Sequence, residues 1–157
     1  MIAFSRVDDR LIHGQVQTRW ISNIRCNKIF IVDDKVAADP FIRSVLLLSI
    51  PNNIKLYIFT VDEAIEKISS AKDTSDRVLI LFKTPVSVLR LMKGGMEIKN
   101  LNIGPMSSKP NAKYIVKNVY LLDEEIDALK ELEKSGTNIY FQLVPEDRKI
   151  KLTDLKI

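Results

Sequence analysis

The chain has 157 residues, 46% of them hydrophobic and 28% charged, which is typical of one soluble globular domain and excludes intrinsic disorder. Its single cysteine, Cys26, excludes an internal disulfide, and its single histidine, His13, excludes a metal site built from two or three histidines. The net charge of +4 is too small to indicate nucleic-acid binding, so we expect no nucleic-acid partner.

The first half of the chain alternates short apolar runs with segments of helical spacing. Lys28–Val32 is almost continuously apolar, as in a strand buried on both faces of a parallel sheet. Asp39 is the predicted N-cap of a helix whose first residue is Pro40. The pattern predicts strands over Ile2–Val7, Lys28–Val32 and 54–59, and helices over 12–24, 36–48 and Val61–Ser69.

The second half continues the alternation. Thr84 and Pro85 form a helix start, and Asp123 is the predicted cap of a later helix that ends at Gly136. The composition of 104–113 predicts a loop, and the tail 149–157 predicts an edge strand or a docking segment. The remaining predicted strands are 77–82, 98–103, 117–122 and 138–144, with a helix from 85 that stops at Gly94 and Gly95.

This order predicts a single domain, residues 1–157, with a three-layer α/β/α fold and a mostly parallel central sheet of about six to seven strands. In such sheets ligands bind beyond the carboxyl ends of the strands. The residues that follow the predicted strands are therefore the candidates for a functional site.

The scarcity of glycine narrows the choice of site. The five glycines form no dinucleotide-binding, P-loop or hydrolase motif. The sequence also contains no signal-peptide pattern and no apolar run long enough to span a bilayer, so we expect a cytoplasmic protein.

The segment after the first strand carries the parts of a phosphohistidine site. An arginine, Arg10, offers a planar fork of donors to phosphate oxygens, and His13 offers a nucleophilic imidazole near neutral pH. Gly14 stands at a predicted helix start, where free N–H groups favour an anion, and Asp9 is placed to orient the ring or the arginine. A histidine at such a junction also serves commonly as a capping or hydrogen-bonding residue.

Two further strand ends offer weaker candidates. Thr84, after Lys83, is placed to cap a helix and aim its amides at the same phosphate, although an N-cap alone explains it. Lys109 and neighbouring donors in the loop 104–113 suit an anion or a partner, or only a solvated connection. Asp33 and Asp34 are expected to end a strand and cap a helix, and the sequence requires no metal and no cofactor.

These motifs resemble the IIB components of the mannose/fructose/sorbose type of bacterial sugar phosphotransferase system. The resemblance is carried by RVDDRLIHGQVQTRW (residues 6–20), VDDKVAADP (32–40), KTPVSVLRLMKGG (83–95) and NIGPM (102–106), and it covers nearly the whole chain. Its first motif is specific, because this run of charged residues, aliphatics, histidine, glycine and glutamine rarely follows a strand.

The resemblance implies a transferase that takes a phosphoryl group from a IIA domain onto His13, at Nδ1, and passes it to a sugar held by the membrane components IIC and IID. It places Arg10 and Asp9 in the same loop, and Gly14, Gln15, Thr84 and Lys109 around the phosphoryl group. It also implies a position at the inner face of the membrane, attached through IIC and IID. The stretch from Gly104 to Pro110 departs from the family pattern, and Lys109 stands there in place of a basic residue of the family.

Alternatives stay open at this point. One is a non-catalytic regulator that binds an anion or nucleotide on the same fold, and another is a receiver-like module phosphorylated on Asp8 or Asp9. Apolar residues in the tail, Leu152, Leu155 and Ile157, are expected to be exposed and leave formation of a homo-oligomer open. The charge pattern predicts that Arg10, Lys83 and Lys109 cluster near His13.

Overall fold

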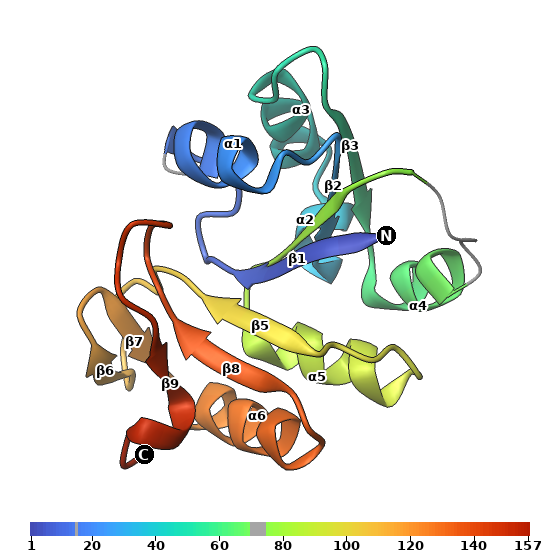
Figure 1. Cartoon of the computed structure of the whole chain (residues 1–157). Coiled ribbons are helices and arrows are strands. Elements are labelled where there is room, and N and C mark those ends of the chain that lie inside the picture. Colours follow the sequence, from blue (N-terminus) through green and yellow to red (C-terminus); the bar gives the residue numbers. More distant parts are fainter. Residues whose placement is uncertain (15, 70–74) are drawn as a thin grey trace.

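The computed structural model describes residues 1–14, 16–69 and 75–157. Its centre is a seven-stranded sheet in the order β3-β2-β4-β1-β5-β8-β9, in which all neighbours are parallel except β8 and β9 (Figure 1). The predicted fold class is therefore confirmed. The strands are β1 (Ile2–Val7), β2 (Lys28–Val32), β3 (Lys55–Phe59), β4 (Val78–Phe82), β5 (Asn100–Ile103), β8 (Asn138–Phe141) and β9 (Ile150–Lys151).

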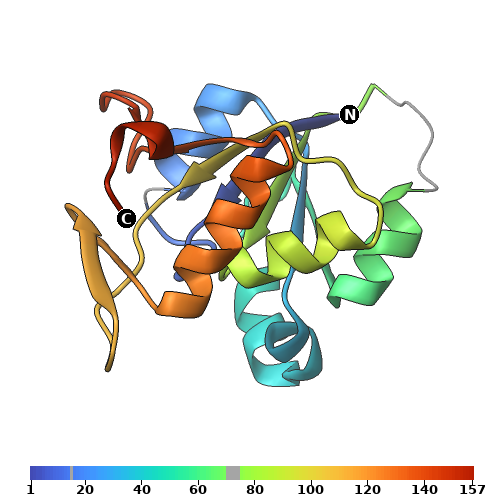
Figure 2. The ribbon, with the colours of Figure 1, turned by 90° about the horizontal axis from the view of Figure 1, so that it is seen from below.

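Helices cover both faces of this sheet. One face carries a π-helical turn, η1 (Val16–Trp20), then α1 (Ile21–Ile24), α2 (Asp34–Ala38) and α3 (Pro40–Leu48). The other face carries α4 (Val61–Ser69), α5 (Pro85–Lys93) and α6 (Asp123–Lys134), which lie side by side in Figure 2. A short 3-10 helix, η2 (Leu152–Asp154), follows β9.

Strand β4 shows why two helical layers are needed. Its alternate residues Leu79 and Leu81 face the core beneath α1–α3, whereas Ile80 and Phe82 face the core beneath α4–α6. All five β4 residues are buried, because successive side chains of a strand point to opposite faces. In β2, which was predicted to be buried on both faces, Ile29 and Ile31 join one core and Val32 joins the other, with Phe30 partly buried.

Two predicted helices are not continuous α-helices. The predicted helix 36–48 is interrupted at Asp39, whose backbone is extended and whose side chain accepts hydrogen bonds from the amides of Phe41 and Ile42. Pro40 disfavours helical geometry in the residue before it, so Asp39 caps α3, as predicted, and α2 stands apart. In the predicted helix 12–24, Gly14 is helical, as its predicted place at a helix start requires, and the residues from Val16 form a π-helical turn rather than a regular α-helix.

The predicted strand 117–122 does not join the sheet. Its residues form β7 (Val119–Leu121), which pairs antiparallel with β6 (Lys113–Val116) in a separate hairpin whose two-residue turn places Asn118 at φ 61°. Met106, inside the predicted loop, is fully buried and forms a bridge to Val119 that attaches the hairpin to the end of β5. This long-range bridge, rather than local propensity, decides where the hairpin lies.

The tail packs against the molecule instead of lying free. It contributes the antiparallel edge strand β9, and Leu152 is buried while Leu155 and Ile157 pack against the core, so they are not the exposed residues expected. The most exposed large apolar side chains among the described residues are instead on α3, at Phe41 and Leu48. Formation of a homo-oligomer stays a prediction.

The N-cap of α6 is Leu122 rather than the predicted Asp123, because the Glu125 carboxylate accepts the Leu122 amide at 2.9 Å and draws the helix start back by one residue. No helix within residues 1–14, 16–69 and 75–157 is long and apolar enough to cross a membrane.

Candidate functional site

The site is built on a tight turn at the carboxyl end of β1. The amide of Leu11 donates to the carbonyl of Asp8 at 2.9 Å, and Leu11 adopts a left-handed backbone with φ 54°. A branched residue is strained in this region, and it is held there because its side chain is buried in the core beneath η1 and α1. The turn reverses the chain and brings His13 back over the end of the strand.

His13 is held by a buried carboxylate. The Nε2 atom of its imidazole lies 2.9 Å from Oδ2 of Asp8, whose side chain has no exposed surface. An ionised carboxylate only accepts hydrogen bonds, so this contact places a proton on Nε2 and leaves the lone pair on Nδ1. No hydrogen bond to Nδ1 occurs among the residues that the structure describes. The ring is therefore oriented with one nitrogen occupied and the other available as a nucleophile.

Asp8 receives donors on both of its oxygens. Its Oδ2 also accepts from Nη2 of Arg6 at 3.1 Å and Nε of Arg6 at 3.3 Å, while Oδ1 accepts the backbone amide of Arg10 at 3.1 Å. A buried charge is stable only when it is paired and hydrogen-bonded, and Asp8 meets both conditions. This saturation also makes Asp8 a poor phosphoacceptor, which argues against the receiver-like alternative at that position.

Arg6 is the support beneath Asp8. Its guanidinium is completely buried, donates to the side chain of Asn102 on β5 and to the carbonyls of Gln142 and Leu143 at 3.1 Å each, and lies 4.8 Å from the ring centroid of Trp20. Burial lowers the pKa of Arg6 from its ordinary value, and the ion pair with Asp8 opposes this shift.

The packing of the Arg6 side chain also explains why residue 104 is a glycine. A Cβ atom at this position would collide with the Arg6 guanidinium, so only glycine leaves room for the buried arginine. The backbone of Gly104 is held against β1 by a 2.8 Å hydrogen bond from its amide to the carbonyl of Val7. Arg6 thus joins β1, β5 and the segment after β8 into one rigid base.

The predicted site residues near His13 differ in their exposure and in their contacts. Arg10 is exposed, and its side chain forms no hydrogen bond or ion pair within the described residues. Gly14 is also exposed, with open space beside its Cα. Asp9 does not contact the ring: its Oδ2 accepts the amide of Ser107 at 2.7 Å, and its buried Oδ1 has no hydrogen-bond partner among the described residues. Gln15 lies outside the described residues.

Thr84 and Lys109 meet at a different carboxylate. The hydroxyl of Thr84 donates to Glu125 at 3.0 Å, and the ammonium of Lys109 lies 2.9 Å from the other oxygen of Glu125. Thr84 also caps α5, as predicted, by accepting the amide of Val86 at 3.3 Å. No contact joins Thr84 or Lys109 to His13 in the part of the chain that the structure describes.

A polar cavity of about 490 Å³ lies between these groups. Asp9, Lys83, Thr84, Lys109 and Glu125 all line it, whereas His13 and Arg10 do not. Lys83 and Lys109 therefore share one cavity, and the expected cluster of both with Arg10 around His13 stays a prediction. The phosphate-binding roles of Thr84 and Lys109 stay predictions.

Sequence reasoning missed the orienting role of Asp8 and the support given by Arg6. A signal for both was present, because Arg6 near the end of β1 and Asp8 directly after it are opposite charges at positions i and i+2, which share one face in extended backbone. Two charges that share a buried face are expected to pair with each other. The described residues contain no group of three or more histidine, cysteine, aspartate or glutamate side chains arranged to hold a metal ion.

Comparison with known proteins gives one consistent family. The model of the PTS system sorbose subfamily IIB component matches residues 2–156. The chain is 34% identical over 155 residues to the mannose-specific EIIAB component of Escherichia coli K12, covering 99% of this chain and 48% of that protein. It is 33% identical to the sorbose-specific EIIB component of Klebsiella pneumoniae, covering 98% of this chain and 93% of that one.

Solved structures agree with this result. The IIBSor domain of the sorbose permease from Klebsiella pneumoniae superposes with a TM-score of 0.92 at 32% identity, covering 98% of this chain and 94% of that one. The manxB protein of Thermoanaerobacter tengcongensis gives a TM-score of 0.89 at 37% identity, covering 98% and 93%. The chain spans about half the length of the mannose-specific relatives it matches. The chain belongs to the sorbose subfamily of IIB components of the phosphotransferase system.

Proposed function

We propose that the chain is a phosphoryl carrier that accepts a phosphoryl group from a phosphohistidine of a IIA domain on Nδ1 of His13 and transfers it to a sugar. The observation that carries this proposal is the 2.9 Å contact between Asp8 and Nε2, which leaves Nδ1 as the nucleophilic nitrogen. Membership of the IIB family supports the phosphotransferase class of the reaction.

In the first step the lone pair of Nδ1 attacks phosphorus while the N–P bond of the donor breaks, and the donor imidazole keeps that electron pair. The accepting ring would gain positive character as the new bond forms, and the carboxylate of Asp8 stabilises it through Nε2–H. In the second step a sugar hydroxyl attacks phosphorus and the N–P bond at His13 breaks. The hydroxyl proton then passes to the freed Nδ1, and the resulting imidazolium is paired with Asp8 until it loses that proton to water.

Arg10 is the residue suited to the phosphoryl oxygens. It is exposed, follows the carboxylate that orients the ring, and has no protein partner within the described residues, so its guanidinium is free to bind two oxygens at once. The open space beside Gly14 admits the phosphoryl group and the approaching donor without a steric clash. Both roles follow from positions at the turn that carries His13.

The partners in this proposal are a IIA donor, the membrane components IIC and IID, and the sugar they hold. The IIB family and the name of the sorbose-specific relative support this setting at the inner face of a membrane. The mannose-specific relative is named an EIIAB component, which supports a IIA domain as the phosphoryl donor.

The test is incubation of the chain with phosphorylated IIA carrying a labelled phosphoryl group. We expect one labelled histidine, lost in mild acid and stable in base, because a phosphoramidate and an acyl phosphate differ in this respect. The His13→Ala variant should take up no label, whereas Cys26→Ala should take up the normal amount, since Cys26 is buried outside the site. Normal labelling of His13→Ala would overturn the proposal, and tight anion binding without any labelling would favour the regulatory alternative.

A further inference from the structure

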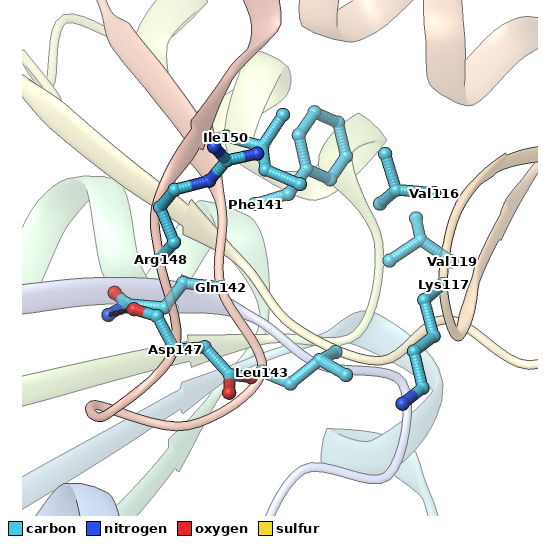
Figure 3. Close-up of a pocket in the computed structure, with 9 residues that line it drawn as sticks. All are labelled: Val116, Lys117, Val119, Phe141, Gln142, Leu143, Asp147, Arg148 and Ile150. Carbon is cyan, nitrogen blue, oxygen red and sulfur yellow. Dashed lines mark hydrogen bonds between the residues drawn. The ribbon is translucent and has the colours of Figure 1, made fainter.

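A second cavity lies beside the site, and nothing so far described uses it. It has a volume of about 270 Å³ and opens between the β6–β7 hairpin and the segment that joins β8 to β9 (Figure 3). Its apolar walls come from both sides, with Val119 and Phe141 buried and three partly buried side chains around them. Those three are Val116, Leu143 and Ile150.

The cavity carries two free cations. Lys117 and Arg148 lie on opposite sides of it in Figure 3, both are exposed, and neither forms an ion pair within the described residues. The acidic lining residue, Asp147, lies near the backbone amide of Val144, which donates to it at 3.4 Å. An apolar cavity between two unpaired cations suits an apolar group that has a carboxylate beside it.

The hairpin presents Lys117 firmly. The two-residue turn between β6 and β7 places it next to Asn118, and the carbonyl of Asn118 accepts the amide of Met106 at 3.0 Å. Because Met106 is completely buried, the turn is held against the body of the molecule. The wall of the cavity is therefore largely formed before a partner arrives, which lowers the entropy cost of binding.

The cavity lies close to His13, because a chain of three hydrogen bonds connects His13 to Leu143, one of the residues that line the cavity. Nε2 of His13 lies 2.9 Å from Oδ2 of Asp8, this oxygen lies 3.1 Å from Nη2 of Arg6, and the same nitrogen lies 3.1 Å from the carbonyl oxygen of Leu143. The backbone of Leu143 is thus within about 9 Å of the imidazole. A standard protein interface covers about 800 Å² on each partner, a disc of roughly 16 Å radius.

A donor protein must bring its own phosphohistidine into contact with Nδ1, so its surface covers the surroundings of His13, this cavity included. We propose that the cavity is a docking site for the phosphohistidine donor protein, which inserts an apolar side chain flanked by acidic groups that pair with Lys117 and Arg148. This inference rests on the proposed function. Cytoplasmic loops of membrane proteins are enriched in lysine and arginine, so the cationic rim favours the soluble donor over the membrane components.

The test measures the rate at which phosphorylated IIA labels His13 as the concentration of IIA is varied. In the double variant Lys117→Glu/Arg148→Glu we expect KM for the donor to rise about tenfold with kcat unchanged, because attraction at the rim becomes repulsion. The matched control is Lys130→Glu, a charge reversal at an exposed lysine on α6 that forms no ion pair within the described residues, and its KM should stay within twofold of the parent value.

A second variant tests the apolar part without changing charge. Val116→Phe adds volume at the partly buried wall of the cavity and should raise KM severalfold by excluding the donor side chain. Far-ultraviolet circular dichroism and thermal unfolding verify that each variant is folded. Phosphoramidate, a small chemical donor that needs no docking surface, should label His13 equally in all of these proteins.

The outcomes separate the two proposals. If neither IIA nor phosphoramidate labels His13 in the parent protein, the proposed function fails. If both label it and KM for IIA is unchanged in the charge-reversed and Val116→Phe variants, the docking site is wrong while the function stands. If labelling by IIA is unchanged but transfer to sugar in membranes containing IIC and IID is slowed, the cavity serves the acceptor side and the donor assignment is overturned.

Discussion

Of the buried carboxylates at the carboxyl edge of the sheet, Asp8 after β1 and Glu125 in the first turn of α6 each bind a cationic side chain. Asp8 is held by Arg6, His13 and a backbone amide, and Glu125 by Lys109, Thr84 and a backbone amide. Both are fully satisfied, so burial and saturation alone do not distinguish a reactive group from a structural one. The difference is that one partner of Asp8 is a ring with a second, available nitrogen that can act as a nucleophile, whereas the partners of Glu125 are an ammonium, a hydroxyl that also caps α5 and a backbone amide.

The largest expected effect comes from removing the support of Asp8. Arg6→Met leaves a buried carboxylate without its counter-ion, and we expect the free energy of unfolding to fall by about 3–5 kcal/mol. Urea denaturation measures this change. Arg6→Lys keeps the charge but loses the bonds to Asn102 and to the carbonyls, and it should fall in between. A loss below about 1 kcal/mol for Arg6→Met would show that Asp8 does not depend on this pair.

The orientation of the ring should control the rate of transfer. Asp8→Asn preserves the shape of the side chain but replaces the carboxylate with an amide, which can donate as well as accept hydrogen bonds. The ring proton is then no longer held on Nε2 of His13, and the positive charge that develops on the ring is not balanced. We expect the rate of phosphoryl transfer to His13 to fall about 100-fold or more, by analogy with carboxylates that orient catalytic histidines. Rapid-quench labelling with saturating IIA measures it. Asn102→Asp alters the other partner of Arg6 and should not abolish transfer, so equal losses in both variants would contradict a specific role for Asp8.

The corresponding substitution at Glu125 should lower the stability of the fold and leave the rate of phosphoryl transfer nearly unchanged. Glu125→Gln weakens the pair with Lys109 and the bond that holds the start of α6, and we expect a loss of about 1–2 kcal/mol in the free energy of unfolding. The rate of transfer to His13 should change by less than about twofold. A large loss of rate at unchanged stability would show that the Glu125 cluster takes part in the reaction.

The Lys109→Ala variant tests whether the contacts of Glu125 are structural or take part in phosphoryl transfer. Because this ammonium is already bound to Glu125, we expect a loss of about 1 kcal/mol or less in stability and little change in transfer. The predicted role of Lys109 in binding phosphate leads to a different result, a rate that falls tenfold while stability stays constant. Measuring both quantities on the same preparation decides between them.

The smallest effect is expected at an exposed pair on the rim of the polar cavity. The hydrogen bond from Arg90, 2.6 Å away, holds the pKa of Asp34 below its ordinary value of 3.8. A lowered carboxylate pKa stabilises the fold above pH 3.8, and this contribution is lost as the pH falls through the lower folded value. Since both side chains are nearly half exposed, Asp34→Asn should cost less than about 1 kcal/mol at pH 7, and the difference should shrink as the pH is lowered below 3.8. A pH-independent difference would contradict this origin.

The local parts of the fold were predictable because their causes are local. Pro40 and Pro85 each follow a residue that caps a helix through its side chain, and the structure confirms both starts. The all-apolar strands are the ones buried on both faces, as their composition indicates. The hairpin was mispredicted because its position depends on the contact of Met106 with Val119, which no local pattern reveals.

The features of the site also fall into those that the sequence predicted and those that only the tertiary structure revealed. Sequence alone singled out His13, since it is the one histidine and follows a strand, and it placed Arg10 and Gly14 in the same turn. It chose Asp9 as the orienting carboxylate, whereas tertiary structure assigns that contact to Asp8. The choice between two adjacent aspartates depends on the left-handed turn at Leu11 and on which carboxylate faces Arg6.

By itself, then, the sequence determined the alternating layers, the helix starts at Pro40 and Pro85 and the identity of the candidate phosphoacceptor, because these depend on residue type and short-range spacing. Only the tertiary structure decided which carboxylate orients the ring, which nitrogen remains available, and which cations stay unpaired beside the site. Those features rest on contacts such as Arg6 with Asn102 and Leu143, which are 96 and 137 residues apart in the chain. The energy of such contacts depends on burial and on geometry at a few ångströms, which spacing along a chain does not encode.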